Sequence, residues 1–177
     1  MKLSKSYFSF LFTLLYVSGF SQNTYFPNGT IHTKGDKVNG EYIEYFGDGI
    51  QIMVKCNYVN GEIEGDYYQY HNNGNVLEHG KYKNGKKSGE WNIWNRKGNI
   101  SHIVHYSKGM KNGIELSFYS NGEIIRSNYL NDNLDGECIL YDANGKITQI
   151  RNYSNGKKLK FYLYSDDATK IDITDKL

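Results

Sequence analysis

The sequence predicts an all-β protein: an elongated, single-layer antiparallel meander of stacked β-hairpin repeats. Glycines spaced nine residues apart recur five times with a period of 23 to 25 residues, which is typical of a repeat array whose units bury apolar surface only against their neighbours. Between the glycines stand β-branched and aromatic residues, which favour strands, and no stretch shows a helical period. The glycine pairs are Gly40/Gly49, Gly65/Gly74, Gly89/Gly98, Gly113/Gly122 and Gly136/Gly145.

Two aromatic columns recur when the units are aligned on their first glycine. We number positions by their offset from this glycine. At offset five the aromatics are Tyr45, Tyr70, Trp94, Phe118 and Tyr141. At offsets sixteen to eighteen the tyrosines are Tyr58, Tyr82, Tyr106, Tyr129 and Tyr153. Each unit therefore predicts two strands and two turns, about eleven strands in all.

The turns are predicted by Asn-Gly dipeptides, which tolerate the positive φ that two-residue hairpins require. These dipeptides are Asn28-Gly29, Asn73-Gly74, Asn84-Gly85, Asn121-Gly122, Asn144-Gly145 and Asn155-Gly156. A half unit precedes the array at Tyr25 to Ile31, and the pattern stops near Lys160. Pro27 is the only proline, so no proline blocks ladder hydrogen bonds downstream.

Residues 1–21 predict a secretory signal peptide. Lysines at positions 2 and 5 precede an apolar run at 7–17, and Gly19 and Ser21 stand at the −3 and −1 positions of a cut before Gln22. The apolar run is shorter than the about 20 residues of a spanning helix, so we expect no membrane span in the mature chain; an uncleaved anchor is the alternative. Residues 22–164 are expected to form the repeat domain, and residues 165–177 a short cap or a frayed end.

The charge of the mature chain argues against nucleic-acid binding. The full chain has 21 basic and 19 acidic residues, and removal of residues 1–21 takes away two lysines and no acid. Strong sequence-independent binding of nucleic acid requires clustered cations, and no excess of cations remains.

The run Tyr-x-x-Gly-x-x-x-Gly-x-aromatic, as in Tyr58 to Tyr67 and Tyr82 to Trp91, resembles the MORN repeat family. The closer resemblance is to its bacterial variant, the YwqK-like antitoxin repeat proteins, and it covers roughly residues 25–162. The resemblance implies an elongated sheet of stacked hairpins that binds proteins or, in some eukaryotic relatives, membrane lipids. The antitoxin label implies a cytoplasmic partner, whereas the leader indicates export.

No arrangement of residues predicts catalysis, a metal site or a cofactor. The closest histidine pair, His102 and His105, is separated by three residues, which places the two side chains on opposite faces of a strand. Cys56 and Cys138 lie some seven strands apart in the repeat register, or over about 30 Å, which excludes a disulfide within one chain. No Gly-x-Ser-x-Gly elbow occurs. We therefore expect a protein that is not an enzyme.

Offsets two and five have opposite parity, so the two columns face opposite sides of the sheet. We expect the column at offset five to be a buried structural spine, because it is aromatic in all units. Offset two reads Tyr42, Tyr67, Trp91, Glu115 and Cys138. A dry core does not accept Glu115 without a partner, so this face is expected to be the wetter one. Tyr42, Tyr67 and Trp91 then form either an exposed strip for a peptide or a glycan, or ordinary sheet packing.

These observations predict an exported repeat scaffold that mediates protein–protein interaction in the bacterial envelope. The periplasm, the cell surface and secretion remain open as its location. The alternative function is a carbohydrate or cell-wall binding module that uses the aromatic strip.

Overall fold

The computed structural model describes residues 23–25 and 31–176. The described residues form one sheet of fifteen strands, followed by one 3-10 helix. The elements are β1 (Thr24–Tyr25), β2 (Ile31–Lys34), β3 (Gly40–Tyr45), β4 (Ile52–Val59), β5 (Glu62–Ile63), β6 (Gly65–Tyr70), β7 (Val76–Lys83), β8 (Lys86–Trp94), β9 (Ile100–Ser107), β10 (Met110–Phe118), β11 (Ile124–Leu130), β12 (Asn133–Tyr141), β13 (Ile147–Ser154), β14 (Lys157–Tyr164), β15 (Lys170–Asp172) and η1 (Thr174–Lys176). The expected leader and the Asn28-Gly29 turn lie outside the described residues.

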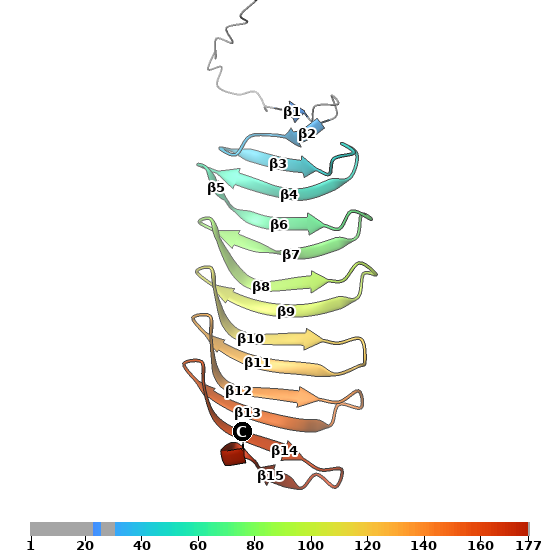
Figure 1. Ribbon diagram of the computed structural model, residues 1–177. Helices are drawn as coiled ribbons and strands as arrows, with labels where there is room; N and C mark the ends of the chain where they lie inside the picture. Colours follow the sequence, from blue (N-terminus) through green and yellow to red (C-terminus); the bar gives the residue numbers. More distant parts are fainter. Residues whose placement is uncertain (1–22, 26–30, 177) are drawn as a thin grey trace, which may run out of the picture.

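The predicted meander is confirmed. The strands follow one another in sequence order from β1 to β15, every pair is antiparallel, and only β5 leaves this path, by pairing with β4. Figure 1 shows the hairpins stacked into one long, open sheet. Eleven strands, β3, β4 and β6 to β14, correspond to the repeat strands that the sequence predicts. The additional strands β1, β2, β5 and β15 have two to four residues each and lie in the half unit, in a turn and in the tail.

Two kinds of turn alternate along the two sides of the sheet. On one side, two-residue turns join neighbouring units, and both turn residues have positive φ, as in Asn84 (49°) and Gly85 (66°). This is the geometry of a type I′ hairpin, as predicted. The turn that lacks glycine has the same form, because Asn131 and Asp132 adopt φ values of 49° and 66°.

On the opposite side, the prediction of two-residue turns is wrong. Only the glycine has positive φ there, as in Gly74 (86°). The N–H of His71 donates to the carbonyl of Asn75 and the N–H of Gly74 donates to the carbonyl of His71, which closes a three-residue loop with a bulged glycine. The side chain of Asn73 accepts the N–H of Asn75, and this local bond favours a type I turn. The loops at Asn121-Gly122 and Asn144-Gly145 have the same two backbone hydrogen bonds. Asn121 again accepts a local N–H, whereas in the second loop Asp142 accepts the N–H of Asn144.

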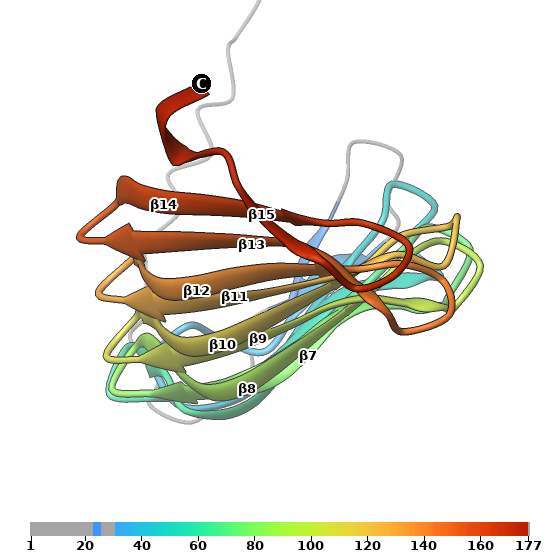
Figure 2. The same ribbon diagram turned by 90° about the horizontal axis from the view of Figure 1, so that it is seen from below.

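The first glycine of each unit bends its strand. Between β9 and β10, Tyr106 pairs with Lys111 whereas Val104 pairs with Glu115, so β10 has two extra residues around Gly113, whose φ is 108°. The two extra residues form a bulge that bends the strand. Because their number is even, the side chains before and after the bulge keep their alternation between the two faces. The strands are therefore strongly curved, as Figure 2 shows from below.

Hydrogen bonds join the bent ends of successive units. The turn glycines donate to the preceding unit, as in Gly85 N–H to the Ile63 carbonyl (3.1 Å) and Gly109 N–H to the Lys87 carbonyl (2.9 Å). The residue before the first glycine of a unit adds a side-chain acceptor in several units, as where Glu64 accepts the N–H of Asn84 at 2.7 Å. This column is polar in every unit, as Asn39, Glu64, Ser88, Asn112 and Asp135. The sequence therefore contained a signal for these hydrogen bonds between units, in a polar column that the alignment on glycines and aromatics did not identify.

The described part of the tail, residues 165–176, contacts the last repeat strand. β15 pairs with Tyr162–Tyr164 of β14. Beyond it, the N–H of Ile173 donates to the carbonyl of Phe161, and the N–H of Phe161 donates to Thr174 Oγ1, each at 2.9 Å. The tail therefore occupies the edge of β14 at residues 161–164, where an open edge would accept a strand from another chain.

Candidate functional site

Most of the core of this single-layer sheet lies on one face, which we call the inner face. It carries one continuous row of side chains across the repeat strands, in which Trp91 lies opposite Val104 and Val104 opposite Glu115. Trp91 has no exposed surface and Val104 is 2% exposed. The row consists of Tyr42, Cys56, Tyr67, Gly80, Trp91, Val104, Glu115, Ser127, Cys138, Arg151 and Phe161.

An aromatic cluster surrounds Trp91. Its ring lies 5.7 Å from that of Tyr67, 5.2 Å from that of Tyr82 and 6.1 Å from that of Tyr106. The indole Nε1–H donates to the carbonyl of Lys81 at 3.2 Å. Edge and tilted ring contacts of this kind add stability beyond the area that they bury. The tyrosines of the second strands therefore fold over the offset-two residues and exclude water from them.

Burial changes the acidity of this face. Desolvation raises the pKa of Tyr42 and of Tyr129 to about 12, with smaller contributions from the carboxylates of Glu44 and Glu115 respectively, and it raises the pKa of Tyr67 still further. Burial also raises the pKa of the Cys56 thiol to about 11. These groups are therefore neutral at physiological pH, and Cys56 is not an activated nucleophile.

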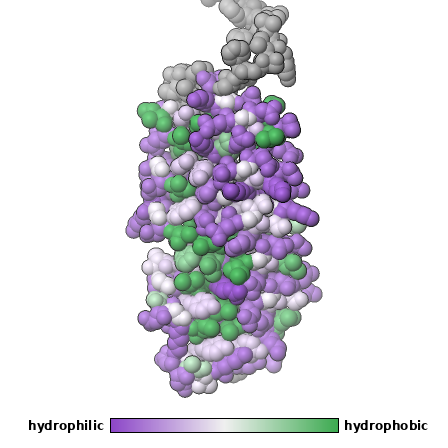
Figure 3. Space-filling view, turned by 180° about the vertical axis from the view of Figure 1, so that it is seen from behind, coloured by the Kyte–Doolittle hydropathy of each residue, from purple (hydrophilic) through white to green (hydrophobic). Residues whose placement is uncertain are grey.

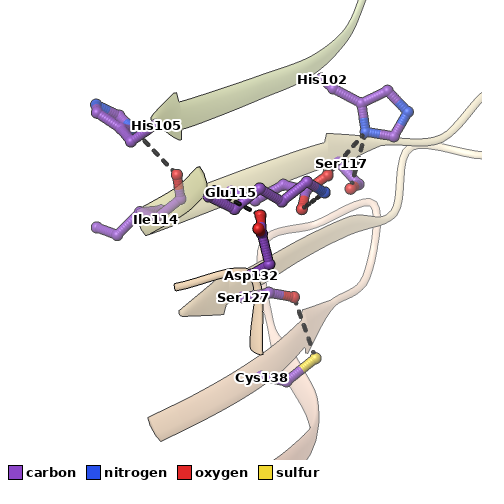
Figure 4. A network of polar contacts seen from close by, with 9 residues as sticks. His102, His105, Ile114, Glu115, Ser117, Ser127, Asp132 and Cys138 are labelled. Atoms are coloured by element: carbon purple, nitrogen blue, oxygen red, sulfur yellow. Dashed lines mark hydrogen bonds and ion pairs between the residues drawn. The ribbon is translucent and has the colours of Figure 1, made fainter. Parts of the chain in front are cut away.

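Lysines complete the inner face and explain how it accepts carboxylates. Lys111 Nζ lies 2.6 Å from Glu115 Oε2 and 4.8 Å from the centre of the Tyr129 ring. His102 Nδ1 lies 3.6 Å from the other Glu115 oxygen. Figure 4 shows Glu115 and His102 in this network. In the preceding unit, Lys87 Nζ lies 3.7 Å from the centre of the Trp91 ring and 3.0 Å from Glu78 Oε2, so cation–π and ionic contacts share one ammonium group.

The expected roles of the two aromatic columns are reversed. Tyr42 and Trp91 are buried and Tyr67 is half-buried, so these residues are not an exposed strip. Their burial also removes the observation that supported a glycan-binding module. The expectation failed because Glu115, 9% exposed, has the ionic partner that sequence reasoning did not supply. The spine residues Tyr45, Tyr70, Trp94, Phe118 and Tyr141 are all half-buried, and none reaches the core.

The spine residues instead form a ladder on the opposite, outer face. Each lies across from an aliphatic residue of the next strand, in the pairs Tyr45–Ile52, Tyr70–Val76, Trp94–Ile100, Phe118–Ile124 and Tyr141–Ile147. We call these ten residues the aromatic ladder. No second layer of described residues covers it. Figure 3 looks onto the outer face and shows hydrophobic residues gathered over its C-terminal half.

The histidines and cysteines of the described part form no reactive centre. His71, His102 and His105 contact the Trp94 carbonyl, Ser117 and the Ile114 carbonyl at 2.9 to 3.1 Å. His79 stacks on Tyr68 with ring centres 4.2 Å apart. Nowhere in residues 23–25 and 31–176 do three His, Cys, Asp or Glu side chains gather as metal ligands. Both cysteines are free. The same residues contain no helix long and apolar enough to span a bilayer.

Comparison with known families identifies the repeat. The MORN repeat variant matches residues 63–84 and 134–155, which cover the β6–β7 and β12–β13 hairpins. No curated protein matches the chain at a significant level. Both matches begin two residues before the first glycine of a unit, and the hairpins around them share the same turns and bulges. The chain therefore contains two repeats that match the MORN repeat variant, within an array of hairpins of the same form.

Proposed function

We propose that this protein is an exported, non-catalytic scaffold that binds a protein partner in the bacterial envelope through its outer face. MORN repeats generally act as protein- or membrane-interaction modules. The observation that supports the outer face is the aromatic ladder, whose ten residues are half-buried and uncovered. Uncovered apolar surface of this extent is typical of interaction sites in soluble proteins.

The geometry of the aromatic ladder suits a partner that is bound along the sheet. Its aromatics recur every second strand, roughly 9.6 Å apart. Aromatic rings provide large contact area at low conformational entropy cost and dominate binding hot spots. The inner-face aromatics Tyr42, Tyr67 and Trp91 stabilise the fold instead. The covered edge of β14 favours a partner that contacts side chains over one that adds a strand.

The cellular location that we propose rests on the signal peptide predicted at residues 1–21. Residues 1–21 have the charged start, the short apolar run and the small residues of a secretory signal peptide. We therefore expect the mature chain to begin at or near Gln22. N-terminal sequencing of the protein isolated from its native envelope tests this, and a chain that still starts at Met1 or Lys2 contradicts cleavage.

Site-specific photo-cross-linking tests the binding face. A photoreactive side chain at position 94 or 118, both in the aromatic ladder, is expected to cross-link the same protein in the native envelope. The matched control is position 130, because Leu130 is 51% exposed but lies at the end of β11 opposite to the ladder residue Ile124. Cross-links from position 130 alone, or sedimentation of the mature chain with insoluble polysaccharide and without any protein, would overturn the proposal.

A further inference from the structure

A second feature of the outer face lies beside the aromatic ladder and is centred on Arg126. Across β9 to β13, five consecutive residues lie opposite one another in the middle of this face. Leu116 pairs with Ile103 and with Arg126, and Ile139 pairs with Arg126 and with Ile150. We call these five residues the outer patch. Ile139 is 7% exposed and the other four are half-buried, so one arginine stands in the centre of an aliphatic surface.

Arg126 has no interaction partner among the described residues: it makes no hydrogen bond, ion pair or ring contact there. Glu137, on the same face of β12, is not within ion-pair distance of it. Lys55, the equivalent residue of the first unit, contacts Glu41 at 2.7 Å. Arg151, on the inner face, bonds Gln149 at 2.8 Å and packs on Phe161. The lack of a partner therefore distinguishes Arg126 from comparable cations of the sheet.

The charge and the hydrogen-bond donors of the Arg126 guanidinium determine which kind of partner the outer patch can bind. Arg126 is half-buried between Leu116 and Ile139, an arrangement in which an arginine typically lays its aliphatic stem along apolar neighbours and keeps its charged end at the surface. A wholly apolar partner would desolvate the charge without compensation, which is unfavourable. A carboxylate matches the planar donors and forms two parallel hydrogen bonds. Arg126 is the one cation among the five residues of the outer patch, which is too few to hold a polyanion or an anionic bilayer there, because these require clustered charges.

We propose that the outer patch is the docking site for a protein segment that presents one Asp or Glu carboxylate among apolar side chains, with the carboxylate paired to Arg126. This inference rests on the proposed function and specifies the partner's chemistry. The apolar side chains of the segment contact Ile103, Leu116, Ile139 and Ile150, and the carboxylate fixes its register. Charge complementarity thus gives specificity to a surface that is otherwise only hydrophobic.

Selection from a randomised peptide library tests the inference. The chain from residue 22 to residue 177 is immobilised and used to enrich twelve-residue peptides. Peptides with a single acidic residue flanked by apolar residues are expected to be enriched. For a selected peptide, Arg126→Gln is expected to weaken binding about tenfold, in the range of a hot-spot contact. Replacing the acidic residue of the peptide with its amide is expected to have the same effect, and no further loss is expected when both changes are combined.

Matched variants make the outcome specific. Lys55→Gln and Arg151→Gln are expected to leave peptide affinity unchanged, and circular dichroism must show that every variant is folded under the conditions of the binding assay. Enriched peptides that depend on Trp94 but not on Arg126 would overturn this inference while leaving the proposed function intact. Enrichment that is insensitive to both Trp94→Ala and Arg126→Gln, or no enrichment at all, would overturn both.

Discussion

The indole ring of Trp91 lies directly on the backbone of Gly80. A Cβ atom at Gly80 would be 2.3 Å from the ring, a distance that real Cβ contacts do not reach. Gly80 is also the only member of the inner row without a side chain. The largest side chain of the row therefore lies across from its smallest residue, and each requires the other.

Gly80→Ala is expected to destabilise the fold by about 3 kcal/mol, because the added methyl group overpacks a site where the indole has no room to move. Chemical denaturation of Gly80→Ala, Trp91→Ala and the double variant measures this. In the Trp91→Ala background the cost of Gly80→Ala is expected to disappear, because the two residues are in contact. Additive losses in the double variant would contradict the packing described here.

The two tryptophans are expected to respond oppositely to truncation. Trp91→Ala is expected to cost about 3 to 5 kcal/mol, because it leaves a cavity in the core. Trp94→Ala is expected to cost about 1 kcal/mol, because its ring is half-exposed in the aromatic ladder. The denaturant midpoints of the two variants make the comparison. If Trp94→Ala is the more damaging change, the assignment of inner and outer faces is wrong.

The bend of each unit depends on a glycine backbone. Gly89 has a φ of 71°, and a Cβ atom there would meet no other atom within 4 Å, so the cost of Gly89→Ala is backbone strain alone. We expect a loss of about 1 to 2 kcal/mol. Gly47→Ala is the matched control, because Gly47 is equally open but its φ is not positive. Equal midpoints for the two variants would show that the bend does not require positive φ.

The inner-face tyrosines are expected to make the fold sensitive to alkali. The folded-state pKa of Tyr42 and of Tyr129 is about 12, whereas the unperturbed value is 10.0. Above about pH 10 the unfolded chain loses these protons while the folded chain retains them, so stability falls as the pH rises through the folded pKa. Denaturant midpoints from about pH 8 to about pH 11, read beside the near-UV absorbance of tyrosinate, measure this. A midpoint that rises over this range would contradict the burial of these hydroxyls.

The reactivity of the two cysteine thiols is expected to show that the repeats follow one another in a linear array. Cys56 and Cys138 lie in the same inner row but on β4 and β12, too far apart for a disulfide. Titration of the denatured, non-reduced chain is expected to find two free thiols. In the native chain, Cys56 is expected to react slowly, because burial raises its pKa to about 11. A Cys56→Ser variant identifies its signal, and an intramolecular disulfide would contradict the register.

The repeat period, the glycine columns and the β-rich composition were sufficient to predict the meander and its eleven repeat strands. These features are local: a type I′ turn such as Asn84-Gly85 and the strands beside it follow from backbone preferences that adjacent residues express. The alternation of side chains along a strand is also a local property, so the sequence correctly predicted that the columns of Tyr67 and Tyr70 lie on opposite faces of the sheet. It also placed Cys56 and Cys138 far apart.

Which face became the core was decided only by the tertiary structure. The choice depends on contacts between units: the fit of Trp91 on Gly80, the tyrosines that fold over it, and the pairing of Glu115 with Lys111 four residues earlier across a bulge. A core accepts a carboxylate only where the fold places a suitable partner beside it. The spacing of residues in the sequence does not identify that partner. That Arg126 has no charged partner among residues 23–25 and 31–176 is likewise visible only once the strands that flank it are in place.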